Sequence, residues 1–254
     1  MKNIPDNLWK EIKKILPQKN GGVGRPESDN KKAIEGIFFI LRTGAQRCHL
    51  PEKFGKVSTV HGKFMKWCRM NIFKKILVKA REYYRKRNKK NIWYAIDTLS
   101  KKAPLAKNGG KNPTDRGKRG IKQVILVDRK GTPLYVDIAP ANQHDSRLLE
   151  PVLKQMRKSK KTRIIAADSA FDVKRLRKLC KGKNIALTAS TNVRRSKNKH
   201  KSYPRHRWIV EQTFGCLAWN RGLKTSWSKT KEASLAFLQF AAAIRIFKME
   251  GIFV

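Results

Sequence analysis

Acidic residues are scarce in this chain of 254 residues, which has 18 Asp and Glu against 60 Lys and Arg and a formal net charge of +42. The excess is spread along the chain, because residues 1–90 carry 24 basic and 7 acidic side chains and residues 91–254 carry 36 and 11. A hydrophobic share of 40% excludes a disordered basic tail. The sequence therefore predicts a folded protein with an extended surface for a polyanion, most commonly nucleic acid, with an acidic substrate or an anionic membrane surface as alternatives.

Paired cysteines, long apolar runs and a secretory signal are also lacking. The four cysteines form no CxxC pair, which argues against a zinc site and favours reduced thiols. The longest apolar stretch, 235–246, contains Gln239 and Arg245 and is too short to span a bilayer. The N-terminus has no apolar segment of the kind that directs secretion. We therefore expect a soluble cytoplasmic protein with no membrane partner.

The first part of the chain has the apolar periodicity of short helices. Helices are expected over 7–16, from Ser28 or Asp29 to Thr43, from Ser58 or Thr59 through Trp67, and through 72–78. Basic residues flank the third of these helices, so the pattern favours either a helix-turn-helix module or a generic helical bundle with a solvated basic face. The charged run 81–90 is taken as the junction to a second domain.

From residue 91 onward the pattern changes to that of short strands separated by helices. The expected strands are 92–96, 123–127, 134–139, 163–167 and 185–189, and the expected helices are 145–156, 172–180, 205–218 and 231–247. Segments 98–120 and 191–202 are expected to be loops. This order predicts a mixed α/β sheet covered by helices and hence two consecutive domains, 1–90 and 91–254.

Most carboxylates of the second domain have an ordinary structural explanation. Asp145 and Asp172 stand at expected helix starts, where Asp caps free N–H groups, and Asp128 stands in an expected hairpin turn. Asp97 and Asp168 differ, because each ends a mostly apolar run expected to be a buried strand, and ligands of α/β sheets lie beyond such ends. Side by side they would need a cation such as Mg²⁺ to stay ionised together. The alternative is that each is an ordinary strand-end residue.

Glu211 lies on the helix expected over 205–218, next to the side of the helix on which Val210, Phe214 and Leu217 are expected to be buried. An ion pair with Arg207, four residues earlier, would account for Glu211 if it stood alone.

Short blocks of sequence follow one another in a fixed order along both halves of the chain. They are 8–17, 24–26, 37–45, 50–55 and 58–60, and then 95–98, 115–120, 142–146, 167–172 and 207–214. Together they resemble the bacterial insertion-sequence transposases of the DDE class, in the group named after insertion sequence five. Ala170 and Phe171 depart from the usual Gly-Tyr of that group, and Ala218 replaces a basic residue often found two turns after the glutamate.

The resemblance implies a ribonuclease H-like mixed sheet flanked by helices, preceded by a small all-α, helix-turn-helix-like domain. Asp97, Asp168 and Glu211 would be the catalytic and metal-binding residues, holding Mg²⁺ or Mn²⁺ as two ions. The implied partner is double-stranded DNA: the enzyme would cleave terminal inverted repeats and join their 3′-OH ends to target DNA. A homodimer or larger assembly on DNA, associated with the nucleoid, is also implied.

Basic side chains in three places are candidates for DNA contacts: Lys63, Lys66, Arg194, Arg195, Lys197 and Arg207. Arg207 either contacts a phosphate or pairs with Glu211, and segment 191–207 either follows the DNA backbone or is solvated. Two other functions are open to the same sequence. One is a nuclease of this fold that cuts without joining, and the other is a DNA-binding protein without activity, such as an inactive transposase copy.

Overall fold

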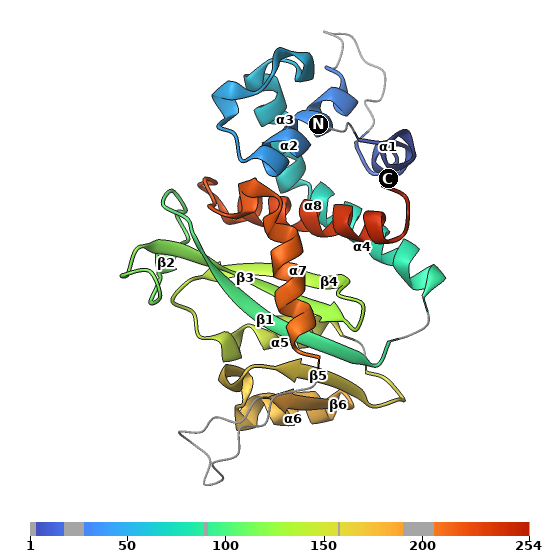
Figure 1. The fold of residues 1–254 in the computed structure, drawn as a ribbon, viewed down its shortest axis with the longest axis vertical. Coiled ribbons are helices and arrows are strands. Elements are labelled where there is room, and N and C mark those ends of the chain that lie inside the picture. Colours follow the sequence, from blue (N-terminus) through green and yellow to red (C-terminus); the bar gives the residue numbers. More distant parts are fainter. Residues whose placement is uncertain (1–3, 18–27, 89–90, 157, 190–205, 254) are drawn as a thin grey trace. The chain divides into compact units, whose positions relative to one another are not determined.

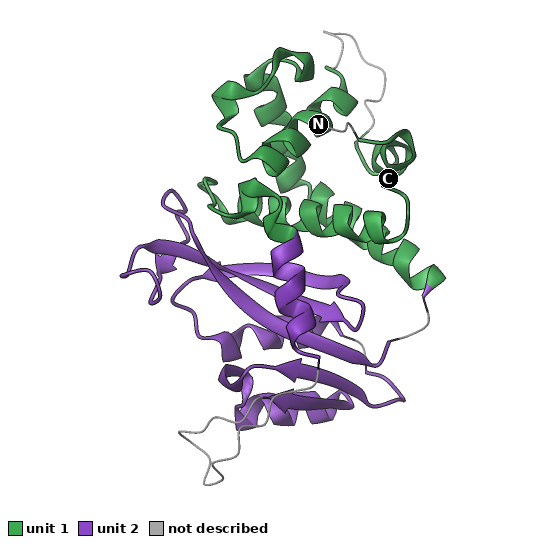
Figure 2. Ribbon diagram, viewed as in Figure 1, with its two compact units in different colours: residues 1–87, 217–254 green, residues 88–216 purple. Residues whose placement is uncertain are grey.

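The computed structural model describes residues 4–17, 28–88, 91–156, 158–189 and 206–253 (Figure 1). The chain divides into two compact units, a helical unit of residues 1–87 and 217–254 and a sheet unit of residues 88–216 (Figure 2). This grouping differs from the two consecutive domains expected from the sequence, because the C-terminal segment joins the N-terminal helices. No helix among the described residues is long and apolar enough to cross a bilayer.

The helical unit contains the helices expected from the apolar periodicity. They are α1 (Asp6–Lys13), α2 (Asn30–Thr43), α3 (Val57–Arg69), α4 (Ile72–Arg87) and α8 (Lys231–Met249). Helix α2 begins where the sequence predicts, and Asp29 caps it by accepting hydrogen bonds from the backbone N–H groups of Lys31 and Lys32. The expected cap of α3 at Ser58 or Thr59 is wrong, because the helix already begins at Val57 and has no side-chain cap.

Aromatic side chains of α8 explain why the C-terminal segment belongs to this unit. Phe237 stacks on Phe64 of α3 with ring centroids 4.7 Å apart, and Phe240 lies 5.4 Å from Phe73 of α4. Burial of one such side chain contributes roughly 1.5–3 kcal/mol. These contacts join segments that are far apart in sequence, so no local sequence pattern predicts them. The helix-turn-helix arrangement itself stays a prediction.

The sheet unit contains the five expected strands and one short addition. The strands are β1 (Trp93–Lys102), β2 (Gly110–Lys111), β3 (Arg119–Asp128), β4 (Pro133–Pro140), β5 (Arg163–Ala167) and β6 (Ile185–Ala189). The helices are α5 (Leu149–Gln155), α6 (Lys174–Gly182) and α7 (Trp208–Ala218), with short 3₁₀ turns η3 (Asp145–Arg147) and η4 (Ser169–Phe171). The loop expected over 98–120 is shorter than predicted, because β1 and β3 remain paired as far as Lys102 and Gly120.

The sheet has the order β4-β3-β1-β5-β6, with β2 pairing the far end of β3. Strand β3 runs against its neighbours β1 and β4, whereas β1, β5 and β6 are parallel. This is a ribonuclease H-like mixed sheet and confirms the predicted fold class. The core beneath one face joins Ile96 of β1 to residues of α5 and α6. Because side chains alternate along a strand, Asp97 faces the other side, which α7 crosses (Figure 1).

Candidate active site

Asp97 lies within β1, opposite Ile125 of β3. Its Oδ1 accepts a hydrogen bond of 2.7 Å from the backbone N–H of Thr98, and its side chain is 18% exposed. The carboxylate is thus held by the backbone at the edge of the core. A carboxylate this poorly hydrated needs a positive partner to stay ionised.

Asp168 follows β5 directly, and β5 runs parallel to β1. The last register pair is Ala95 with Ala166, so continuing the register by two residues brings Asp168 beside Asp97. The Oδ1 atom of Asp168 accepts a 2.7 Å hydrogen bond from the backbone N–H of Ser169 and caps η4. The two aspartates therefore lie side by side on neighbouring strands. The expectation that Asp97 ends its strand is wrong, because β1 stays paired with β3 as far as Lys102, whereas Asp168 does follow the end of β5.

Arg207 joins the third carboxylate to the first. Its Nη1 lies 3.0 Å from Oδ2 of Asp97, and its Nη2 lies 2.7 Å from Oε1 of Glu211, one turn into α7. The pairing of Arg207 with Glu211 that the sequence left open is therefore present, and Asp97 shares the same guanidinium. Glu211 is 53% exposed, so its side chain is free to reorient toward a ligand.

The electrostatic balance at Asp97 favours a bound cation. Burial raises the pKa of Asp97 to about 6, the N–H of Thr98 and the charge of Arg207 oppose this, and the charges of Asp168 and Glu211 add to it. Three carboxylates offer the hard oxygen donors that Mg²⁺ and Mn²⁺ prefer, so the donor set fits such an ion. No three acidic, His or Cys side chains among the described residues already form a metal cluster. Arg207 supplies the positive charge in this arrangement.

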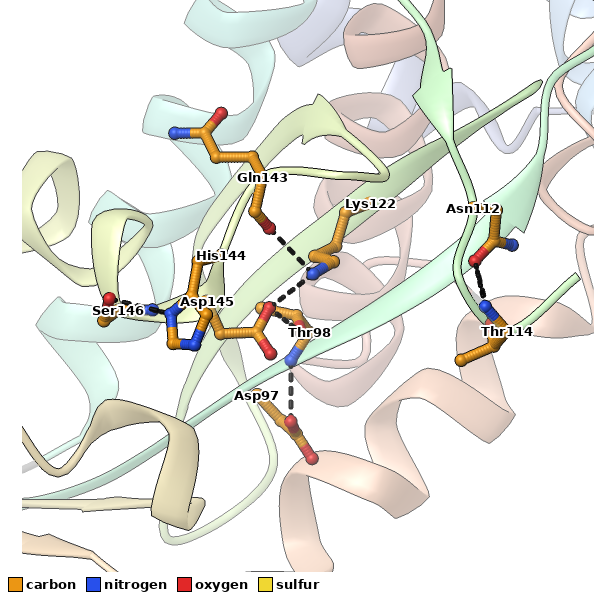
Figure 3. Close-up of polar contacts among 9 residues, drawn as sticks. All are labelled: Asp97, Thr98, Asn112, Thr114, Lys122, Gln143, His144, Asp145 and Ser146. Atoms are coloured by element: carbon orange, nitrogen blue, oxygen red, sulfur yellow. Dashed lines mark hydrogen bonds and ion pairs between the residues drawn. The ribbon is translucent and has the colours of Figure 1, made fainter. Parts of the chain in front are cut away.

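Asp145 is the residue near this site that the sequence analysis missed (Figure 3). Its expected role as a helix cap is wrong, because the His144 ring caps η3. Asp145 Oδ1 instead accepts from the ammonium of Lys122 at 2.7 Å and from the hydroxyl of Thr98 at 2.9 Å. The Lys122 and Asp145 side chains are only 11% and 25% exposed. Thr98 thus binds Asp97 through its backbone N–H and Asp145 through its hydroxyl.

Lys122 completes this group by donating a second hydrogen bond, of 2.9 Å, to the backbone carbonyl of Gln143. The result is a half-buried ion pair that fastens the β4–η3 connection to β1 and β3. No local sequence pattern indicates this pair, because Lys122 and Asp145 are 23 residues apart. The local sequence Asp145-Ser146 instead resembles a helix cap. The one sequence signal for the pair is the alternation along β3, which puts Lys122 on the same face as the buried Val124 and Leu126.

Two other aspartates show how far local patterns are reliable. Asp128 is buried in the β3–β4 turn, as predicted, and accepts from the backbone N–H groups of Lys130 and Thr132. Asp172 was expected to cap a helix and does not, since α6 begins after Val173. Its carboxylate pairs with Arg177 at 2.7 Å, because an exposed arginine one turn into α6 is within reach.

The candidate DNA-binding lysines of α3 have different environments. Lys63 donates to the backbone carbonyl of Ser28 at 2.7 Å and to the Asn30 side chain, so it fastens α3 to the start of α2. Lys66 is exposed. The remaining candidates, Arg194, Arg195 and Lys197, lie outside the described residues, as does most of the 191–207 stretch.

Comparison with known families places the chain in a defined class of protein. Residues 95–246, which include Asp97, Asp168 and Glu211, match the family described as "Transposase DDE domain". The chain belongs to this family of DDE transposases, whose members use divalent metal ions. Residues 4–77 match "Putative transposase of IS4/5 family", which places the chain with the insertion-sequence transposases that its sequence blocks resemble.

Curated relatives cover part of the chain. The putative transposase for insertion sequence element IS402 of Burkholderia cepacia is 27% identical over 144 residues, which are 53% of this chain and 66% of that protein. An uncharacterised protein, y4sN of Sinorhizobium fredii, is 27% identical over 80 residues, 31% of this chain and 64% of that protein. The chain thus spans just under two thirds of the length of these relatives.

Solved structures with a partial likeness include two transposase complexes. The piggyBac transposase synaptic complex with hairpin DNA gives a TM-score of 0.46 at 11% identity, covering 97% of this chain and 72% of that one. The pre-cleavage Mos1 transpososome gives a TM-score of 0.30 at 11% identity, covering 92% and 82%.

Proposed function

We propose that this protein is a DNA transposase that binds the terminal inverted repeats of an insertion sequence, cleaves the element ends and joins their 3′-OH ends to target DNA. The observation that carries the proposal is the parallel register of β1 and β5, which when continued brings Asp97 beside Asp168, with Glu211 joined to Asp97 through Arg207. The positive charge of the rest of the chain fits a polyanionic substrate.

In this proposal Asp97, Asp168 and Glu211 are the catalytic residues and hold Mg²⁺ or Mn²⁺, as two ions. Such ions would neutralise charge on the reacting phosphate and activate the attacking oxygen. The chain contributes rigid positioning, because the backbone N–H groups of Thr98 and Ser169 fix Asp97 and Asp168 in orientation. With a metal ion held by Asp97 and Glu211, the Arg207 guanidinium would lie beside the site, where it could neutralise a DNA phosphate.

The proposed DNA surface extends beyond the acidic site. Exposed Lys66 on α3 and the basic residues Arg194, Arg195 and Lys197 are proposed to contact phosphates, whereas Lys63 has a structural role within the helical unit. Many phosphate contacts make binding steeply dependent on salt concentration. Assembly as a homodimer or larger complex on paired element ends, at the nucleoid, belongs to the same proposal.

Cleavage of duplex DNA that carries the element's terminal repeats tests the proposal. Wild-type protein should cut at the element end only with Mg²⁺ or Mn²⁺, and Asp97→Ala, Asp168→Ala and Glu211→Gln should each lower the rate on the order of a thousandfold or more. Asp137→Asn is the matched control, because Asp137 is also a half-buried strand aspartate that accepts from the next backbone N–H.

A pre-cut end with a free 3′-OH then separates transposition from simple cleavage. Joined product is expected from the wild type, whereas a nuclease without strand transfer would give none. Binding that is indifferent to metal, with no cleavage in Mg²⁺ or Mn²⁺, would overturn the enzymatic assignment in favour of an inactive DNA-binding protein.

A further inference from the structure

Two tryptophans between α7 and α8 are unusually exposed. Trp219 is 76% exposed and Trp227 is 61% exposed, the highest values among the large apolar side chains that the structure describes. Tryptophan has more apolar surface to bury than other residues and is enriched where proteins contact partners. Both side chains lie in one segment, residues 219–229, which we call the tryptophan connector.

The tryptophan connector is firmly attached to the helical unit. Asn220 is 6% exposed and accepts a 3.2 Å hydrogen bond from Arg42 of α2. Gly222 lies so close to the end of α2 that a Cβ atom would come within 3.0 Å of two backbone carbonyl oxygens there. Leu223 is buried with them. The backbone is therefore fixed from one side, and the tryptophans project from a rigid support.

The charged residues of the tryptophan connector are all positive. Arg221, Lys224 and Lys229 are exposed, and residues 212–231 contain no acidic residue. Within the described parts of the chain, none of these three cations forms an ion pair, and neither ring stacks on another ring. The surface thus combines large uncovered aromatic faces with unneutralised cations.

We propose that the tryptophan connector binds unpaired DNA bases, with Trp219 and Trp227 stacking on them and Arg221, Lys224 and Lys229 contacting phosphates. Base stacking on aromatic side chains requires a free base face, which each base of single-stranded or opened DNA can offer and bases in the interior of a duplex cannot. The positive surroundings select a polyanion over a neutral protein partner. This inference rests on the proposed function in one respect, that the ligand is DNA. It adds that the tryptophan connector recognises DNA ends at which the two strands have separated.

Binding of labelled oligonucleotides without metal tests this assignment, with the catalytic carboxylates intact. Three probes of equal length are compared: a single strand, a blunt duplex and a duplex with unpaired bases at one end. The double variant Trp219→Ala/Trp227→Ala should bind the single strand and the open-ended duplex about tenfold more weakly or worse, with little change for the blunt duplex. Trp219→Phe/Trp227→Phe should restore most of the affinity, because phenyl rings also stack.

Two controls separate stacking from charge and from general apolar surface. Met249→Ala removes another exposed apolar side chain of the helical unit and should bind all three probes like the wild type. Arg221→Gln/Lys224→Gln should weaken binding of all probes alike and reduce the slope of log affinity against log salt by about one per contact.

Equal weakening of all three probes by the tryptophan double variant would overturn the stacking role, as would unchanged affinity for all three. Conversion of an oligomeric wild type to a monomer by the same variant would assign the surface to self-association and also overturn it. The outcome is independent of the cleavage assay: selective binding of open ends by a protein that fails to cut would leave this inference standing while refuting the proposed enzyme.

Discussion

The acidic side chains of the helical unit and those of the candidate site in the sheet unit are paired differently. In the helical unit, Asp6 has its own partner in Lys31 at 2.7 Å, and Asp29 caps α2. In the sheet unit, Asp97 and Glu211 share Arg207, and Asp168 forms no ion pair within the described residues. Asp145 and Asp172 of the sheet unit also have basic partners of their own. Only the three candidate-site carboxylates are thus left with a single guanidinium among them in the part of the chain that the structure describes, which is the condition for recruiting a cation.

The largest effect on folding is expected from the ion pair behind the site. Asp145→Ala leaves the Lys122 ammonium unpaired where it is 11% exposed, and should lower the free energy of unfolding by about 3 kcal/mol. Thr98→Val, which removes only the hydroxyl donor, should cost about 1 kcal/mol. Asp172→Ala, which breaks a more exposed pair with Arg177, is the control and should cost less than about 1 kcal/mol. Denaturant titration measures all three, and equal losses for Asp145→Ala and Asp172→Ala would contradict the expectation.

The next effect concerns pH. Burial raises the pKa of Asp97 to about 6 in the folded protein, against an ordinary value of 3.8, so the folded state holds this proton more tightly than the unfolded chain. The stability that this adds is complete below about pH 4 and is lost as the pH rises through 6. Asp97→Asn should therefore raise the free energy of unfolding near pH 7 by up to about 3 kcal/mol in metal-free protein, with no gain near pH 3.5.

Denaturant titrations in EDTA at the two pH values measure this difference. A gain of the same size at both pH values would show that packing, and not ionisation, governs Asp97. Asp97→Asn should also abolish cleavage. Asp97 would then be a residue that lowers the stability of the fold and is needed for the reaction.

A smaller effect is expected from the helix cap in the helical unit. Asp29→Ala removes the acceptor for two backbone N–H groups at the start of α2 and should cost about 1 kcal/mol. Asp29→Ser should retain most of that stability, and DNA cleavage should proceed as in the wild type at temperatures where both variants are folded. Loss of cleavage by a folded Asp29→Ala protein would break the distinction between the two groups of acids.

The smallest effect is expected at Asp6, whose pairing with Lys31 is at the surface. The pKa of Asp6 is lowered by its hydrogen bond to Lys31, yet exposed pairs contribute little because water and salt screen them. Asp6→Asn should leave the thermal midpoint and the metal dependence of cleavage unchanged. A marked change in either would show that acids of the helical unit also serve the reaction.

Much of the sheet was predictable because its central strands are apolar runs, such as residues 163–167 of β5. The ends of β1 and β3 were not, since Lys101, Lys102 and Lys122 interrupt the apolar pattern while backbone pairing continues. Pairing of this kind is a property of two strands together. For the same reason, the joining of α8 to the N-terminal helices through Phe237 and Phe64 has no signature in either segment.

The candidate site, like the sheet, could be predicted from the sequence only in part. Two aspartates that share a register position on neighbouring parallel strands come together wherever the sheet forms, so the positions of Asp97 and Asp168 follow from the strand order, although Asp97 lies inside β1 and not at its end. The sharing of Arg207 by Asp97 and Glu211 depends on where α7 crosses the sheet, and the Lys122–Asp145 pair depends on the register of β3. These are long-range consequences of packing, which outweigh the local cap signal at Asp145.

The most direct test of the central claim is a titration with Mn²⁺, followed by electron paramagnetic resonance, of the protein bound to a terminal-repeat duplex with a non-hydrolysable scissile linkage. The wild type and the control Asp137→Asn should bind Mn²⁺ alike, whereas Asp97→Ala, Asp168→Ala and Glu211→Gln should each weaken binding about tenfold or more. Wild-type Mn²⁺ affinity in any of the three carboxylate variants would contradict the assignment of that residue as a metal ligand.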